Sequence, residues 1–178
     1  MTASSLAALL QPGYLSDLSS LPIEEIRSRR DHASEVEVGL SYVRRLIQGR
    51  LDIVLAELNA RERGVSGGGV HGLVERLPEI LGNRVRAPGT GRLPTLMAPA
   101  DSELSEVARL DDILDADALA SLPERSEAEL GAVVDALAEF EREVSAGRRS
   151  VHDVIDRLQE ELVRRYKSGE ANVDTLLS

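Results

Sequence analysis

Two long stretches of the chain carry apolar residues at helical spacing, with a Gly- and Pro-rich segment between them. The first stretch has a stripe with spacings of 4, 3, 4, 4, 3 and 4, formed by Val36, Leu40, Val43, Ile47, Leu51, Val54 and Leu58. The second has apolar residues at intervals of seven, namely Leu130, Leu137, Val144, Val151 and Leu158. Such patterns are typical of coiled coils, and the consecutive fours indicate a local stutter. Glu141 and Arg148 interrupt the second pattern at positions where apolar residues are expected.

Both stretches open with the signals of a helix N-terminus. Ser20-Leu21-Pro22 is followed by two acidic residues, and Ser121-Leu122-Pro123-Glu124 repeats the pattern. Gly64 and Gly169 mark the expected ends. We therefore divide the chain into an N-terminal segment, short helix or flexible, at 1–19; a first long coiled-coil helix at 20–63; a Gly/Pro-rich connector with short helices at 64–120; a second long coiled-coil helix at 121–168; and a tail at 169–178. The predicted fold is all-α, an antiparallel two-helix hairpin, although a connector of this length also permits a parallel pair.

Composition narrows the class of protein. Of 178 residues, 42% are hydrophobic and 2% aromatic, which disfavours β-sandwiches and barrels. The net charge of -10 disfavours direct binding to nucleic acid or to an anionic membrane, and favours a basic protein surface as partner. There is no Cys, and the three His are far apart, so neither a thiol nucleophile nor a common metal motif is present.

The sequence gives no sign of catalysis or of a membrane location. Gly67, Gly69 and Gly72 satisfy G-x-G-x-x-G, but a predicted helix ends just before them where the dinucleotide fingerprint requires a strand. A flexible linker explains these glycines better. No apolar run approaches the ~20 residues needed to span a bilayer, and the N-terminus lacks the basic start of a signal peptide. We expect a cytoplasmic, non-enzymatic protein without a catalytic cofactor or metal.

A five-residue polar pattern occurs once in each predicted long helix. The first copy is Glu37, Ser41, Arg44, Gln48 and Asp52, and the second is Glu141, Ser145, Arg148, His152 and Asp156. Both have spacings of 4, 3, 4 and 4, which places each set on one helix face along ~22 Å. We call these ten side chains the polar stripes. An apolar residue precedes each of the ten positions except Arg148, where the preceding residue is Gly147, so each stripe borders the predicted seam.

The residue types suggest a guanine-containing ligand. Arg is the usual bidentate partner of guanine O6 and N7, and it also pairs with phosphate. A carboxylate can accept from guanine N1–H and N2–H₂, while Ser and Gln or His can bond phosphate or ribose oxygens. Two matching faces suit a ligand with two-fold symmetry. A solvated charged face and a duplicated coiled-coil hairpin remain alternative explanations of the repeat.

At these residues the chain resembles the RsiG family of actinobacterial anti-sigma factors, whose motif is E-x-x-x-S-x-x-R-x-x-x-Q-x-x-x-D on each helix of an antiparallel hairpin. The first stripe matches the motif in full. The second departs only at His152, which replaces Gln and keeps a hydrogen-bonding side chain whose charge depends on pH.

The resemblance implies a binding protein that takes two molecules of cyclic di-GMP as a dimer on the hairpin, through the ten stripe residues. It further implies that the loaded hairpin captures a WhiG-type sporulation sigma factor, 1:1 and as a monomer, and keeps it from RNA polymerase. Two other functions stay open. One is a coiled-coil protein–protein adaptor with no nucleotide ligand, and the other is a cyclic-nucleotide phosphodiesterase, which lacks metal ligands or a nucleophile here.

Overall fold

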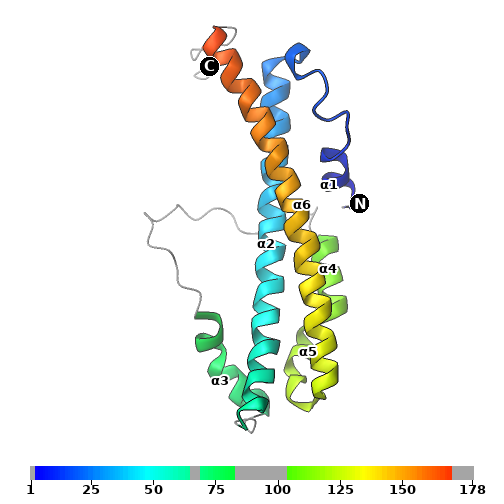
Figure 1. Cartoon of the computed structure of the whole chain (residues 1–178), viewed down its shortest axis with the longest axis vertical. Coiled ribbons are helices and arrows are strands. Elements are labelled where there is room, and N and C mark those ends of the chain that lie inside the picture. The colour runs from blue at the N-terminus through cyan, green and yellow to red at the C-terminus, as the bar shows by residue number, and fades with distance from the viewer. Residues whose placement is uncertain (1–2, 65–68, 83–103, 170–178) are drawn as a thin grey trace.

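The protein is built around two long helices that lie side by side in opposite directions. The computed structural model describes residues 3–64, 69–82 and 104–169. Helix α2 (Ile23–Glu62) and helix α6 (Glu127–Ser168) extend along the whole length of the molecule (Figure 1). Every regular element in these described ranges is a helix. The predicted all-α fold and the antiparallel hairpin are therefore confirmed.

The N-terminus of α6 lies later in the chain than the sequence indicates. Residues Leu122–Glu124 form a short 3-10 helix, η3, and α6 begins only at Glu127. The reason is a reciprocal cap, in which Ser126 Oγ accepts from the backbone N–H of Glu129 while the Glu129 carboxylate accepts from the backbone N–H of Ser126. The predicted start at Ser121 is wrong by six residues, because Pro123 opens the 3-10 turn rather than the long helix.

The first long helix begins in a similar way. The 3-10 helix η1 (Leu18–Ser20) precedes it, and Ser20 donates its hydroxyl to Asp17 O at 2.8 Å instead of capping α2. Pro22 occupies the cap position without a side-chain hydrogen bond. At the other ends, Gly64 and Gly169 adopt positive φ angles of 69° and 78°, which favour glycine and terminate both helices.

The apolar seam between α2 and α6 forms the core. Most of the stripe predicted on α2 is buried, as are all five residues at intervals of seven on α6. Leu51 and Leu58 are only partly buried and pack against the edge of this core. Phe140, Val154 and Leu162 complete it from α6. Because burial of each large apolar side chain contributes about 1.5–3 kcal/mol, the seam supplies the main driving force for hairpin formation.

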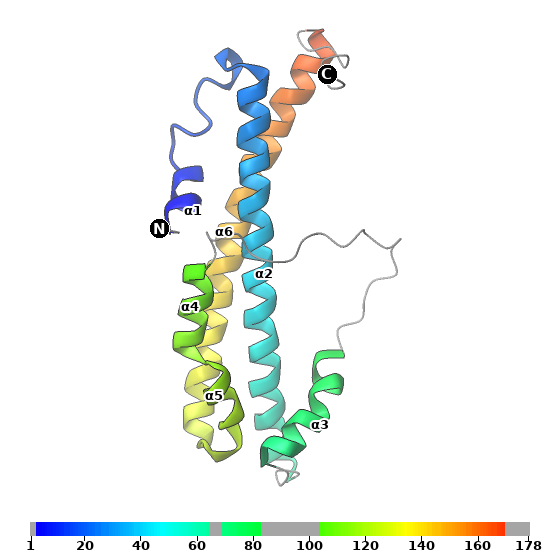
Figure 2. The same cartoon turned by 180° about the vertical axis from the view of Figure 1, so that it is seen from behind.

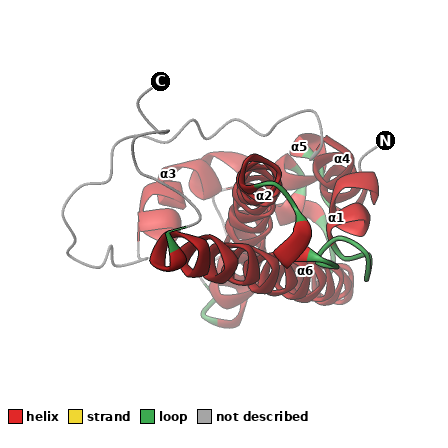
Figure 3. Ribbon diagram, turned by 90° about the horizontal axis from the view of Figure 1, so that it is seen from above, coloured by secondary structure: helices red, strands yellow, loops and turns green. Residues whose placement is uncertain are grey.

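Short helices cover one flank of the hairpin. Helices α1 (Ala3–Leu9), α4 (Leu104–Ile113) and α5 (Ala116–Ala120) lie on the same side of the long pair (Figures 2 and 3). A Cβ atom at Gly147 would lie 3.1 Å from Leu6 Cδ2, so α1 approaches α6 closely there. The Arg109 guanidinium of α4 lies 4.4 Å from the centre of the Phe140 ring.

Helix α3 (Gly69–Gly82) lies beside the C-terminal part of α2 and contains Pro78. The predicted connector therefore does carry short helices, namely α3, α4 and α5. Its residues 65–68 and 83–103, and the predicted tail beyond Gly169, lie outside the described residues.

Two arginines close the ends of the hairpin in the same manner. Arg61 of α2 donates to Arg125 O at 2.6 Å and Leu122 O at 2.8 Å, in the turn before α6. Arg165 of α6 donates to Leu21 O at 2.5 Å and Leu18 O at 2.6 Å, in the turn before α2. Each arginine is also paired through Nε with a glutamate four residues earlier, Glu57 or Glu161. We call these two arrangements the end clamps.

The end clamps have the same register as the polar stripes. Arg165 follows Arg61 by 104 residues, and so do Leu122 after Leu18, Glu127 after Ile23 and Glu141 after Glu37. The repeat therefore extends from the turn before each long helix to its last turn. The hairpin is a pair of equivalent units related by an approximate two-fold axis.

The end clamps should be worth more than ordinary surface ion pairs. We expect Arg61→Ala and Arg165→Ala each to lower the free energy of unfolding by about 2–3 kcal/mol, because each leaves partly buried carbonyl oxygens without their donor and removes an ion-pair partner from a glutamate. Arg164→Ala is the matched control, since Arg164 is 50% exposed and pairs with the same Glu161. The free energy of unfolding of Arg164→Ala should fall by less than about 1 kcal/mol. Urea unfolding followed by circular dichroism measures all three, and equal losses in the three variants would contradict the clamp.

Candidate functional site

The two polar stripes lie on the flank of the hairpin opposite α1 and α4. At about 100° per residue, the stripe on α2 lies to one side of the buried Val36 and Ile47. Arg50 lies to the other side, where it donates to the backbone of α4 at Leu110 O, 2.9 Å away. On α6 the stripe likewise lies to one side of the buried seam residues. Gly147, which α1 approaches, lies to the other side. Because the helices are antiparallel and equivalent, both stripes face the same side of the molecule.

The stripes meet through two reciprocal ion pairs across the hairpin. Arg44 Nε of α2 lies 2.8 Å from Glu141 Oε1 of α6, and Arg148 Nε of α6 lies 2.8 Å from Glu37 Oε1 of α2. The equality follows from the motif: in both copies the Arg comes seven residues, about two turns, after the Glu. In an antiparallel pair this spacing sets each Arg opposite the Glu of the other helix.

The same two carboxylate oxygens also contact the Ser, Gln and His side chains of the stripes. Glu37 Oε1 accepts from Ser41 Oγ at 2.7 Å, and His152 Nε2 lies 3.3 Å from it. Glu141 Oε1 accepts from Ser145 Oγ at 3.0 Å and from Gln48 Nε2 at 3.0 Å. His152 thus takes the place that Gln48 takes in the other half. Eight of the ten stripe residues belong to these two networks, and Arg44 Nε also donates to Ser145 Oγ at 3.0 Å.

The two aspartates of the stripes, Asp52 and Asp156, lie one turn beyond Gln48 and His152 in the sequence. Because the helices are antiparallel, they lie toward opposite ends of the hairpin. Asp52 is half-buried and Asp156 is exposed. The face therefore has a paired centre and a carboxylate at each end.

Both central glutamates are held ionised. Burial alone would raise the pKa of Glu37, but the hydrogen bonds from Arg148 and Ser41 and the charges of His152 and Arg148 outweigh it and lower the pKa below its ordinary value. In Glu141 burial again acts upward, and the hydrogen bonds from Arg44, Ser145 and Gln48 lower the pKa. Their contribution to stability is therefore present at neutral pH and is lost as the pH falls through these lowered values.

In each ion pair, the arginine and the glutamate both keep polar atoms that bond to no other described residue. Arg44 and Arg148 form their pairs through Nε, and no described residue accepts from their Nη1 or Nη2 groups. The second oxygen, Oε2, of Glu37 and Glu141 likewise has no donor among the described residues. The two guanidinium side chains are 35% and 33% exposed. Their outer N–H groups are positioned to donate two parallel hydrogen bonds to a planar ligand with paired acceptors.

Sequence reasoning placed these residues on one face but missed that they pair with each other. Glu141 and Arg148 looked like polar interruptions of the α6 seam. In the structure they border the seam, half-buried, and complete the pairs with Arg44 and Glu37. The equal Glu-to-Arg spacing in two antiparallel helices is the signal that predicts this pairing.

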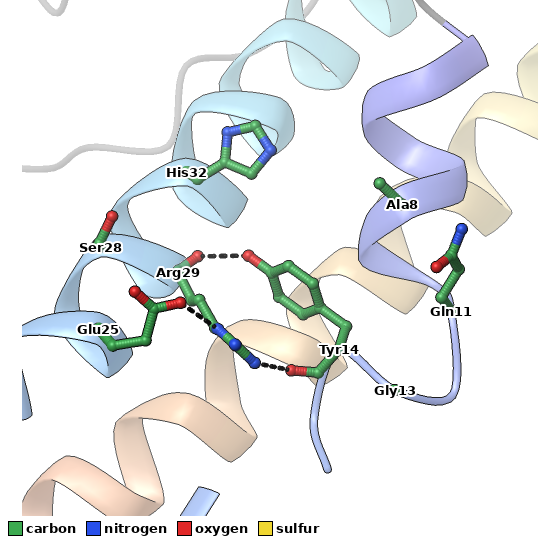
Figure 4. A pocket seen from close by; sticks show the side chains of 8 residues that line it. All are labelled: Ala8, Gln11, Gly13, Tyr14, Glu25, Ser28, Arg29 and His32. Atoms are coloured by element: carbon green, nitrogen blue, oxygen red, sulfur yellow. Dashed lines mark hydrogen bonds and ion pairs between the residues drawn. The ribbon is translucent and has the colours of Figure 1, made fainter. Parts of the chain in front are cut away.

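A separate polar pocket lies near the N-terminus (Figure 4). Tyr14 Oη donates to Arg29 O at 3.1 Å, and Arg29 Nη1 donates to Tyr14 O at 2.6 Å. The Arg29 guanidinium lies 5.4 Å from the centre of the Tyr14 ring and is also paired with Glu25. These contacts fasten the segment after α1 to α2. The pocket contains none of the ten stripe residues.

The described residues contain no group of three or more Asp, Glu or His side chains arranged to hold a metal ion. None of the helices in the described ranges is both long enough and apolar enough to cross a membrane.

Comparison with known proteins identifies the family of the chain. It matches the RsiG-like family over residues 12–81 and 116–178, which together make up most of its length. No curated protein matches the chain significantly. The RsiG-like family is a regulatory anti-sigma family rather than a family of enzymes. Both polar stripes lie within the matched segments, and the chain belongs to the RsiG-like family.

Proposed function

We propose that the protein is an anti-sigma factor that binds a dimer of cyclic di-GMP on the polar stripes and, once loaded, sequesters a WhiG-type sporulation sigma factor from RNA polymerase. The observation that carries the proposal is the reciprocal pairing of the stripes into one two-fold face. This pairing sets one guanidinium group in each half of the face, each with its outer N–H groups available. A ligand built from two equal halves matches such a face.

The chemistry of the face fits guanine. The Nη1 and Nη2 groups of Arg44 and Arg148 can each donate to guanine O6 and N7, while Nε stays on Glu141 or Glu37. The carboxylates of Asp52 and Asp156 can accept from guanine N1–H and N2–H₂. One Arg and one Asp per half would then read two different edges of a base, which a simple charged surface does not do.

The sigma factor enters the proposal through family membership and through charge. The chain carries -10 net charge, so a basic surface on the partner is favoured electrostatically. A dinucleotide dimer resting on a convex pair of helices keeps much of its own surface exposed. A partner that covers the ligand would bury that surface and touch protein and nucleotide together.

The alternative is a helical adaptor that binds proteins without a nucleotide. The cross-hairpin ion pairs favour it to the extent that they stabilise α2 against α6 and would be useful without any ligand. Calorimetric titration of cyclic di-GMP into the purified chain separates the two functions. Saturable binding supports the proposal, and its absence both with and without sigma factor supports the adaptor.

Arg44 and Arg148 should be tested with a substitution that preserves the ion pair. Arg44→Lys and Arg148→Lys keep a positive charge beside Glu141 and Glu37 but remove the planar fork that guanine needs. We expect each to weaken cyclic di-GMP binding by about 1–3 kcal/mol, with the melting temperature close to that of the parent. Parental affinity in both variants would show that the stripes do not read guanine.

Ligand and sigma factor should bind cooperatively. If the partner covers the nucleotide, each must raise the affinity of the other by the same factor, with a coupling free energy of order 1–3 kcal/mol. Titrating sigma factor into the protein with and without cyclic di-GMP measures this coupling. Asp52→Asn and Asp156→Asn replace a pair of acceptors by one acceptor and one donor. They should lose only the nucleotide-dependent part of sigma binding. Equal sigma affinities with and without nucleotide would rule out gating by the ligand.

A further inference from the structure

Each stripe arginine is followed directly by a second arginine. Arg45 comes after Arg44 and Arg149 after Arg148, so the second arginines are also 104 residues apart. They lie outside the five-residue motif. Resting on the function proposed above, we propose that Arg45 and Arg149 bind the phosphodiester groups of the nucleotide, at the outer edge of the stripe in each half of the hairpin.

Their position on the helices suits this role. Arg45 lies about 100° further round α2 than Arg44, on the side of the stripe that points away from the seam. It is one turn from both Ser41 and Gln48, and its Nε donates to Ser41 O at 3.1 Å. Arg149 has the equivalent position beside Ser145 and His152 on α6. Both arginines are exposed. Each therefore lies next to the Ser and Gln or His side chains, which are the neutral donors of its stripe.

The charge balance of the motif requires additional cations. The ten stripe residues contain two arginines against four carboxylates, and the whole chain carries -10. Arg44 and Arg148 are already paired with glutamates that are held ionised, so the centre of the face has no excess positive charge. Each phosphodiester brings one negative charge into this surface. Arg45 and Arg149 are the positive groups that directly adjoin the stripe in both halves.

The internal repeat sets these two residues apart from the other arginines of α2. At the positions equivalent to Arg27, Arg29, Arg30 and Arg50, helix α6 has Gly131, Val133, Val134 and Val154. Only three arginines of α2 recur in α6, namely Arg44, Arg45 and Arg61. The cross-hairpin ion pair explains the recurrence of Arg44, and the end clamp explains that of Arg61. Arg45 and Arg149 belong to neither arrangement, and both recur beside the Ser and the Gln or His of their stripe, as a shared contact with a two-fold ligand would require.

The salt dependence of binding distinguishes a phosphate contact from a contact with guanine. Cyclic di-GMP is titrated by calorimetry into the full chain and into Arg45→Ala and Arg149→Ala, each at several salt concentrations. Removing a phosphate contact should weaken binding about tenfold at low salt and by less at high salt, so the slope of log affinity against log salt should become shallower. Arg45→Lys should keep most of the slope. Arg44→Lys should lose affinity with the slope unchanged, because that residue is assigned to the base.

Arg157→Ala supplies the control for net charge. Arg157 is exposed on α6, about two turns beyond Arg149 and about 80° round the helix from it, and its equivalent on α2 is Ile53. The affinity of Arg157→Ala for cyclic di-GMP should lie within about twofold of that of the parent. If the Arg45 and Arg149 variants match Arg157→Ala in affinity and slope, this inference is wrong while the proposed function stands. If the parent itself does not bind cyclic di-GMP, the proposed function fails.

Discussion

The structure depends on the pairing of each stripe arginine with the glutamate of the opposite helix. A carboxylate at the edge of an apolar seam is costly unless it is paired and hydrogen-bonded. Glu37 and Glu141 meet this condition only when α2 and α6 are antiparallel and in one register, because Arg148 and Arg44 reach them only there. The apolar seam drives association, and the paired charges select the register. A slip of one turn would separate both ion pairs at once.

Two-fold equivalence carries this constraint along the whole hairpin. The end clamps at Arg61 and Arg165 lie far from the stripes, yet they follow the same repeat and hold the turn before the opposite helix. Central ion pairs and terminal clamps therefore act on the same degree of freedom, the sliding of one helix past the other. A ligand with two equal halves requires such control, since an axial shift of one turn, about 5.4 Å, would misalign the two arginines that we propose to bind the bases.

The sequence predicted the long helices and the shared face but missed their mutual contacts, for physical reasons. Apolar spacing at Leu137, Val144 and Val151 defines a buried stripe whatever the partner is, so periodicity alone was sufficient for the seam. The start of α6 depended on a choice between two capping serines, which the reciprocal bonds of Ser126 and Glu129 decided. The pairing of Arg44 with Glu141 follows from the equal Glu-to-Arg spacing only when the register of the two antiparallel helices is known, and the apolar pattern does not fix that register.

The same arrangement links the stability of the hairpin to recognition. Arg44 and Arg148 hold the helices through Nε and leave Nη1 and Nη2 outward, so a ligand can bind without releasing Glu141 or Glu37. Binding would then fix the side chains that already fix the register, and the loaded face would be more rigid than the protein alone. A partner that requires a rigid surface pays less ordering entropy on such a face. Nucleotide gating of a sigma factor would therefore require no rearrangement of α2 against α6, only a ligand that completes and stiffens a surface the fold has already positioned.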